Sequence, residues 1–87
     1  SEQTAQNIAT LQAQKDAPKN TSLIIESTQK YILNKKILGE NDETNYLTLA
    51  VIIKNTENSP SSFGKQYFID LNNGAIVYQI NLIDNAR

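Results

Sequence analysis

Alternating hydrophobic and polar positions are clearest in the segment "YLTLAVIIK", residues 46–54. Leu47, Leu49, Val51 and Ile53 occupy every second position, so they share one face of a predicted strand. Thr48 and Ala50 fall on the opposite face, which is mixed in character. The pattern predicts a strand with one buried face and one partly solvated face.

A second alternating region, "GKQYFIDLNNGAIVYQINLID" (residues 64–84), is interrupted by Asn72, Asn73 and Gly74. Asn-Gly between apolar runs is a strong hairpin signal, because a type I′ turn needs positive φ at both central residues. A two-residue loop at Asn73-Gly74 sets a register that gathers the apolar residues on one face, pairing Leu71 with Ile76, Ile69 with Tyr78 and Tyr67 with Ile80.

Residues 2–17 predict a helix. Ala5, Ile8 and Leu11, together with Ala9 and Ala13, form a narrow apolar stripe at helical spacing. Pro18 ends the helix, because the residue before a proline avoids helical dihedral angles. A stripe this narrow indicates a helix that packs on a sheet by one face.

Residues 22–38 favour either one long bent strand or two strands. A helix over 28–38 is the competing interpretation, because Tyr31, Ile32, Lys35 and Leu38 would share a helical face. We prefer the strand. Residues 39–45 form a polar turn, and residues 55–64, which include Pro60, form a loop.

The order of a helix followed by antiparallel strands predicts an α+β fold. We expect a single domain over residues 1–87, with helix 2–17 packed on a small antiparallel sheet of three to five strands within 22–84, as in cystatin-like folds. The expected core contains Leu47, Leu49, Val51, Ile53, Leu71, Ile76 and Ile80, with at least one of Ile8 and Leu11.

Composition excludes several classes of function. The net charge is -1 and no run of Lys or Arg is present, so we expect no nucleic acid partner. We also expect no membrane span within this chain, because no apolar run reaches about 20 residues. Histidine and cysteine are both absent, which removes the commonest general base, the thiolate nucleophile and the usual zinc ligands.

The remaining candidates for chemistry are weak, so we expect no enzyme, no catalytic residue and no cofactor. Ser59, Ser61 and Ser62 surround Pro60 in a polar loop without a nucleophile motif. Glu26, Asp70 and Asp84 are the acidic residues near predicted strands, and we do not expect them to form a catalytic carboxylate pair. Glu40, Asp42 and Glu43 share one loop, but their spacing does not match a calcium loop, so whether that loop binds Ca²⁺ stays open.

Protein binding is the function class that remains. Strand aromatics usually fill cores, but an exposed set can form a binding surface. A small basic group, Lys30, Lys35 and Lys36, either balances the acidic turn or contacts a partner. Our candidate partner-binding residues are Lys35, Lys36, Tyr46, Tyr67 and Phe68.

The stretch "GKQYFIDLNNGAIVY" resembles the C-terminal hairpin of PepSY domains. The matching residues are Tyr67, Ile69, Asp70, Gly74, Ile76 and Val77, whereas Asn73 replaces the usual Thr. The resemblance covers about a fifth of the chain. It implies a non-catalytic envelope domain that binds or restrains a partner such as a peptidase.

These observations together predict a binding module of a bacterial cell envelope or exported protein. The sequence begins at Ser1, has no methionine and is rich in neutral polar residues, so we expect a periplasmic or extracellular protein tethered through a removed N-terminal segment. The alternatives are a pilin-like subunit, whose partner is an assembly subunit, and a small inhibitor or immunity protein.

Overall fold

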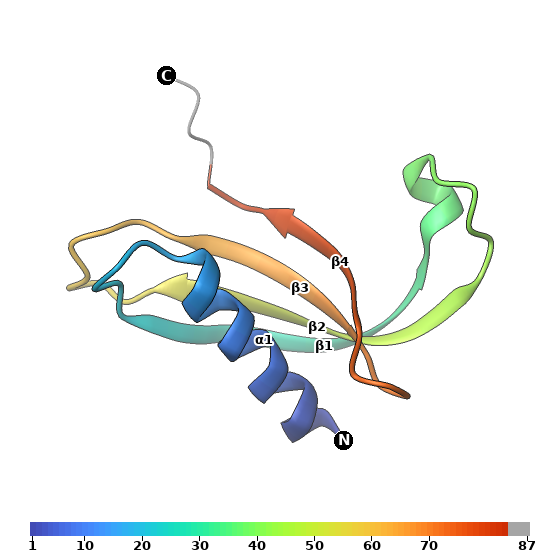
Figure 1. The fold of residues 1–87 in the computed structure, drawn as a ribbon, viewed down its shortest axis with the longest axis horizontal. Helices are drawn as coiled ribbons and strands as arrows, with labels where there is room; N and C mark the ends of the chain where they lie inside the picture. The colour runs from blue at the N-terminus through green and yellow to red at the C-terminus, as the bar shows by residue number, and fades with distance from the viewer. Residues whose placement is uncertain (84–87) are drawn as a thin grey trace.

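A helix lies across one face of a four-stranded antiparallel sheet in the computed structural model, which describes residues 1–83 (Figure 1). The strands follow the chain order β1-β2-β3-β4, so every connection joins neighbours. This arrangement confirms the predicted α+β fold. The elements are α1 (Glu2–Asp16), β1 (Leu23–Asn34), the single 3₁₀ turn η1 (Lys35–Leu38), β2 (Asn45–Asn55), β3 (Gly64–Asp70) and β4 (Ile76–Asn81).

Helix α1 packs on the sheet through alanines. Ser1 caps it by accepting a hydrogen bond from the Thr4 amide at 3.2 Å. Ala5, Ala9 and Ala13 are its buried residues, because small side chains spaced one turn apart let the helix approach the sheet closely. Ile8 is half-buried, whereas Leu11 is 61% exposed and lies off the buried stripe.

No helix within residues 1–83 has the length and apolar content needed to cross a membrane.

Strand β1 confirms the strand interpretation of residues 23–34 and corrects its end. The chain leaves the sheet after Asn34 and forms η1 over Lys35–Leu38, so the helical alternative is wrong for 28–34. Asn34 caps this turn, and Gly39 closes it with φ 88°, a left-handed conformation that glycine adopts without strain. A bulge lies between Ile25 and Ser27.

The core between helix and sheet matches the predicted row of β2 in part. Leu49, Val51 and Ile53 are buried, as predicted, together with Tyr67 and Ile69 of β3. The partly buried residues that pack against this core include Ile8, Leu71 and Ile76. The prediction was wrong for Leu47, which is 40% exposed, and for Ile80, which is 37% exposed.

An irregularity in the β3–β4 ladder explains the error at Ile80. The register shifts by one residue between Phe68 and Ile69, and a one-residue shift turns the later side chains of β4 to the other face. The observed register pairs Ile69 with Ile76 and Gln66 with Ile80, so Ile80 lies on the face opposite the helix. The Asp70 side chain accepts the Asn72 amide at 2.7 Å, and the Asp70 amide bonds the Ala75 carbonyl at 2.8 Å, so the loop opens before the Asn-Gly pair.

Only Gly74 of that pair has positive φ, at 77°, so the predicted type I′ turn is wrong. Asn73 instead accepts the Ala75 amide through its side chain at 2.8 Å. The predicted strand region extended to residue 84, whereas β4 ends at Asn81. Asp84 lies outside the described residues.

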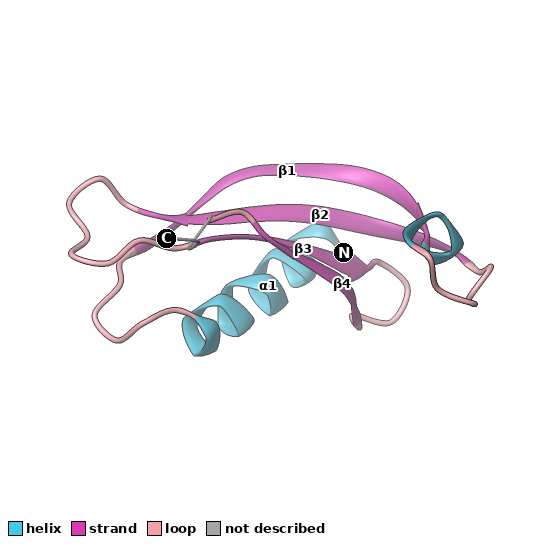
Figure 2. Ribbon diagram, turned by 90° about the horizontal axis from the view of Figure 1, so that it is seen from above, coloured by secondary structure: helices cyan, strands magenta, loops and turns pink. Residues whose placement is uncertain are grey.

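Among residues 1–83, no helix or further strand packs over the face of the sheet opposite α1 (Figure 2). Part of this face is nevertheless buried. Leu33, Ala50 and Phe68 are buried there, and Tyr46, Val77 and Tyr78 pack against them. The Phe68 ring lies 5.7 Å from that of Tyr31 and 6.0 Å from that of Tyr78, in tilted contacts that aromatic pairs favour. This face therefore covers its own small core with aromatic side chains.

Candidate functional site

The ends of β1 and β2 project beyond the rest of the sheet as a two-stranded arm (Figure 1). Thr48 pairs with Asp70, the last residue of β3. Beyond that point the β1–β2 ladder continues through three more pairs: Ile32 with Leu47, Leu33 with Tyr46 and Asn34 with Asn45. We call residues 32–47 the arm, which includes η1 and the acidic loop that follows it.

Hydrogen bonds organise the end of the arm. The Asn34 side chain accepts the Lys36 amide at 2.9 Å and donates to the Asn45 side chain at 2.9 Å. The Gly39 amide bonds the Lys36 carbonyl at 3.0 Å, and the Glu40 amide bonds the Lys35 carbonyl at 3.2 Å. The turn is thus a defined structure that fixes the direction of the side chains it presents.

Four apolar side chains of the arm are left uncovered, whereas Leu33 is buried in the small core on the face opposite α1. Ile37, in the middle of the turn, is 85% exposed, and Leu38 beside it is also exposed. Ile32 and Leu47 face each other across the ladder, and both are exposed. Single exposed apolar residues are ordinary, but several on one projecting element indicate a contact surface.

Both lysines of the arm form ion pairs with acidic side chains of the arm itself. Lys35 lies 3.9 Å from Glu40, and its ammonium lies 5.7 Å from the centre of the Tyr46 ring. Lys36 lies 3.3 Å from Glu43. These pairs leave Asp42 as the acidic side chain of the arm that has no lysine beside it.

Asp42 belongs to the same local network. The Tyr46 hydroxyl donates a hydrogen bond to Asp42, and this bond, supported by the Thr44 amide, holds the pKa of the Asp42 carboxyl below its usual value. The same bond raises the pKa of Tyr46. Tyr46 thereby ties the acidic loop to β2.

The five candidate partner-binding residues fall in three places. Lys35, Lys36 and Tyr46 come together in the arm. Phe68 is 6% exposed at the centre of the open face. Tyr67 lies fully buried beneath α1, where it belongs to the core.

Sequence analysis did not single out Ile37 and Leu38. The signal was present, since two apolar residues follow two lysines directly and precede Gly39, outside any alternation. That arrangement is equally compatible with a strand end buried in a sheet, so only the position of the turn shows that both side chains are exposed.

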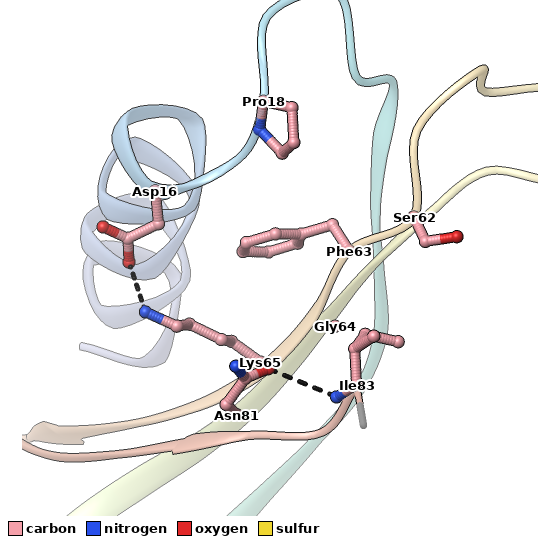
Figure 3. Close-up of a pocket in the computed structure, with 8 residues that line it drawn as sticks. All are labelled: Asp16, Pro18, Ser62, Phe63, Gly64, Lys65, Asn81 and Ile83. Atoms are coloured by element: carbon pink, nitrogen blue, oxygen red, sulfur yellow. Dashed lines mark hydrogen bonds and ion pairs between the residues drawn. The ribbon is translucent and has the colours of Figure 1, made fainter. Parts of the chain in front are cut away.

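A hollow of about 320 Å³ lies beside the C-terminal end of α1 (Figure 3). Lys65 donates to Asp16 at 3.2 Å and to Gln79 at 3.3 Å, while the Tyr67 hydroxyl donates to Asp16 at 2.8 Å. The polar groups at this edge are thus used within the protein. The residues lining the hollow are Asp16, Pro18, Ser62, Phe63, Gly64, Lys65, Asn81 and Ile83.

These contacts shift the pKa values of Asp16 and Tyr67. Burial raises the pKa of the Asp16 carboxyl, but the hydrogen bonds from Tyr67, Gln12 and Lys65, with the Lys65 charge, lower it further than burial raises it. Burial and the bond to Asp16 both raise the pKa of Tyr67. The arrangement anchors α1 to β3, and we assign it that structural role.

The described part of the chain holds no cluster of side chains that could bind a metal ion. Within residues 1–83, no three acidic side chains gather at a point that could hold a metal ion. In the acidic loop, Glu40 and Glu43 turn to lysines, and Asp42 bonds Tyr46.

Comparisons with protein-family models, with curated proteins and with solved structures gave no match to this chain.

Proposed function

We propose that this chain is a non-catalytic protein-interaction module, and that the arm is the part that contacts the partner. The observation that supports this proposal is Ile37, an aliphatic side chain left 85% exposed on a turn fixed by hydrogen bonds at both ends. Its partner surface is an apolar hollow, since the lysines beside it are already paired.

The energetics favour such a contact. Burial of an aliphatic side chain contributes about 1.5–3 kcal/mol relative to leaving it in water. The arm is already ordered by the Asn34 and Gly39 caps, so binding costs less conformational entropy than ordering a loose loop would. A few well-placed side chains usually supply most of the energy of an interface.

The cellular setting remains a prediction from the sequence. An exported or envelope protein, a peptidase partner as the PepSY resemblance implies, and an inhibitor or immunity role are all compatible with binding through the arm. A pilin-like structural subunit is the second candidate, since α1 precedes the antiparallel sheet as it does in those proteins.

Site-specific photo-crosslinking tests the proposal. A benzophenone side chain replaces Ile37 at the end of the arm or, as the matched control, exposed Ala75 in the β3–β4 loop. In cells of the source organism, position 37 should give a discrete protein adduct and position 75 should not, and mass spectrometry identifies the adduct. Equal adducts at both positions, or none at position 37, would argue against the arm, and substrate turnover by the purified chain would argue against a non-catalytic role.

A further inference from the structure

The outer edge of β1 has no strand beside it in the described part of the chain. β1 and β4 are the two edge strands of the sheet, and β1 is the longer, with 12 residues against 6. The buried strand residues beneath α1 belong to β2 and β3, and Figure 2 shows β1 on the far side of β2 from α1. β1 contains no proline, and the free N–H and C=O groups of such an edge can pair with another strand. This edge is therefore a surface for strand addition.

Apolar side chains stay exposed near both ends of β1. Ile24 is 55% exposed near its start, and Tyr31 and Ile32 are 49% and 58% exposed near its end. Residues 26–30, between them, are all polar. The order of side-chain types is thus nearly the same in both directions from Thr28, so a reversed copy of this strand presents apolar groups to apolar groups. The residues in order are Leu23, Ile24, Ile25, Glu26, Ser27, Thr28, Gln29, Lys30, Tyr31, Ile32 and Leu33.

We infer that β1 pairs antiparallel with β1 of a second copy of this chain, about a twofold axis at Thr28. Two sheets of four strands then join into one sheet of eight. The contact is isologous, so it closes at a dimer. The inference goes beyond the proposed function and does not rest on it, because Ile37 and Leu38 lie outside the paired strands.

The bulge in β1 fixes the register of this pairing. Glu26 has no partner on β2, because the register steps from Ile25 to Ser27. Two residues of a bulged strand oppose one residue of its partner, and opposite residues share a face of the sheet. Both conditions are met when Glu26 and Ser27 together oppose Gln29 of the second copy. The remaining pairs are Thr28 with Thr28, Ile25 with Lys30, Ile24 with Tyr31 and Leu23 with Ile32.

These pairs cover the exposed apolar side chains of β1. Ile24 and Tyr31 both lie on the face away from α1, whereas Leu23 and Ile32 both lie on the face toward it. The twofold axis makes each pair occur twice in the dimer. Aromatic and β-branched side chains placed opposite each other stabilise antiparallel sheets, so the apolar ends of the strand favour the contact.

Charge favours this antiparallel arrangement over a parallel one. In a parallel pairing in register, Glu26 would stand opposite Glu26 and Lys30 opposite Lys30, and like charges directly opposite destabilise a sheet. In the antiparallel register, Glu26 lies beside Gln29 and Lys30 opposite Ile25, so no like charges meet. Each of the two charged side chains also has an ion pair at 3.3 Å within its own chain.

Disulfide formation locates the twofold axis. The chain has no cysteine, so Thr28→Cys gives each copy a single thiol. Opposite residues of an antiparallel pair are about 5 Å apart, within reach of a disulfide, so diamide should convert Thr28→Cys to a covalent dimer. Lys30→Cys, two positions along the same face, is the matched control and should stay monomeric, because its two thiols lie more than about 10 Å apart. Faster disulfide formation at position 30 than at position 28 would overturn the inference.

Sedimentation velocity up to about 1 mM measures the association itself. A contact along one strand edge is small, so the wild type should show weak, reversible dimerisation and no larger species. A wild type that stays monomeric over this range would overturn the inference. An adduct to a different protein from position 37 would still support the proposed function in that case, so the two proposals can fail separately.

A charge exchange tests the register. Ile24→Lys with Tyr31→Lys places like charges opposite each other twice in each dimer. Ile24→Glu with Tyr31→Lys places opposite charges there instead, so it should dimerise about 10-fold more tightly than the first double variant. The two positions are about 23 Å apart within one strand, so the difference comes from the contact between copies. Both variants lose the same contact between Tyr31 and Phe68, and circular dichroism checks that both fold. Equal association of the two variants would overturn the inference.

Discussion

Leu47 and Leu49 stand two positions apart on the same face of β2, yet Leu49 is 1% exposed and Leu47 is 40% exposed. The helix makes the difference. Glu2 in the first turn of α1 pairs at 3.3 Å with Lys30, which stands opposite Leu49 in the β1–β2 register. The row of Leu49 is covered, and the next row, Ile32 and Leu47, begins the arm.

Alternation along β2 identifies the residues that share a face, but it does not show whether another element packs over that face. The apolar positions of β2 continue into the arm without any change of pattern. Their burial ends at the N-terminal end of α1 and at the end of β3, so the same kind of residue is buried in the four-stranded part of the sheet and exposed in the arm.

The largest expected effect on stability comes from truncating Leu49, and Leu47 on the same face of β2 is the comparison. Leu49→Ala should lower the free energy of unfolding by about 2–4 kcal/mol, because it removes buried contacts and leaves a cavity. Leu47→Ala should lower it by less than about 1 kcal/mol, because that side chain is already partly in water. Urea unfolding of both variants measures the two losses of unfolding free energy. Equal losses would contradict the distinction between the four-stranded part of the sheet and the arm.

Two glycines with similar dihedral angles give the next contrast. Gly74 has φ 77°, and a Cβ there would lie 3.0 Å from Ile8 Cδ1, whereas Gly39 in the arm has φ 88° and open space around it. Gly74→Val should therefore cost about 2–3 kcal/mol from strain and crowding, and Gly39→Ala about 1 kcal/mol from strain alone. Thermal unfolding measures both changes in stability. A larger loss of stability for Gly39→Ala than for Gly74→Val would contradict this prediction.

A smaller effect concerns the ion pairs. Asp16→Asn should cost about 1–2 kcal/mol at neutral pH, because it weakens the bonds that join α1 to Lys65 and to buried Tyr67. Glu43→Gln in the arm should stay within about 0.5 kcal/mol of wild type, since its pair with Lys36 is exposed.

The Asp16 effect has a defined pH dependence. Its pKa is lowered from 3.8 in the folded protein, so the carboxylate contributes its full stability above that value. The contribution is lost as the pH falls through the lower folded pKa. The gap between wild type and Asp16→Asn should hence narrow below about pH 4, and a constant gap in acid unfolding experiments would show that charge is not the cause.

The smallest effect on stability is expected at Ile37. Ile37→Asp should change the free energy of unfolding by less than about 0.5 kcal/mol, because the side chain has little contact to lose. Chemical unfolding alongside the binding experiments measures this. A loss above about 1 kcal/mol would mean that Ile37 supports the fold and is not simply presented by it.

Several parts of the fold could be predicted because their causes are local. The helix, the strand over 45–55 and the α+β order follow from side-chain spacing, Pro18 and the polar breaks. The β3–β4 register could not be predicted, because two departures combine. The Asp70 side chain captures the Asn72 amide and opens the loop early, and the ladder then shifts by one residue between Phe68 and Ile69. The shift within the ladder is what places Ile80 on the face opposite α1.

The candidate site was found only in part. Lys35, Lys36 and Tyr46 were named from residue type, and all three lie in the arm. Ile37 and Leu38 were missed, because their exposure depends on the chain leaving the sheet after Asn34. Tyr67 was named as a surface candidate but lies under α1, since type alone does not distinguish a buried tyrosine from an exposed one.

The sequence by itself determined which residues of β2 share a face, where α1 ends and which side-chain types are absent, because these follow from periodicity, from proline and from composition. Tertiary structure alone decided which faces are covered. That outcome depends on where α1 ends relative to Leu47 and where β3 ends relative to Thr48, and these are contacts between segments far apart in the chain. The arm exists because β1 and β2 are longer than the elements that cover them.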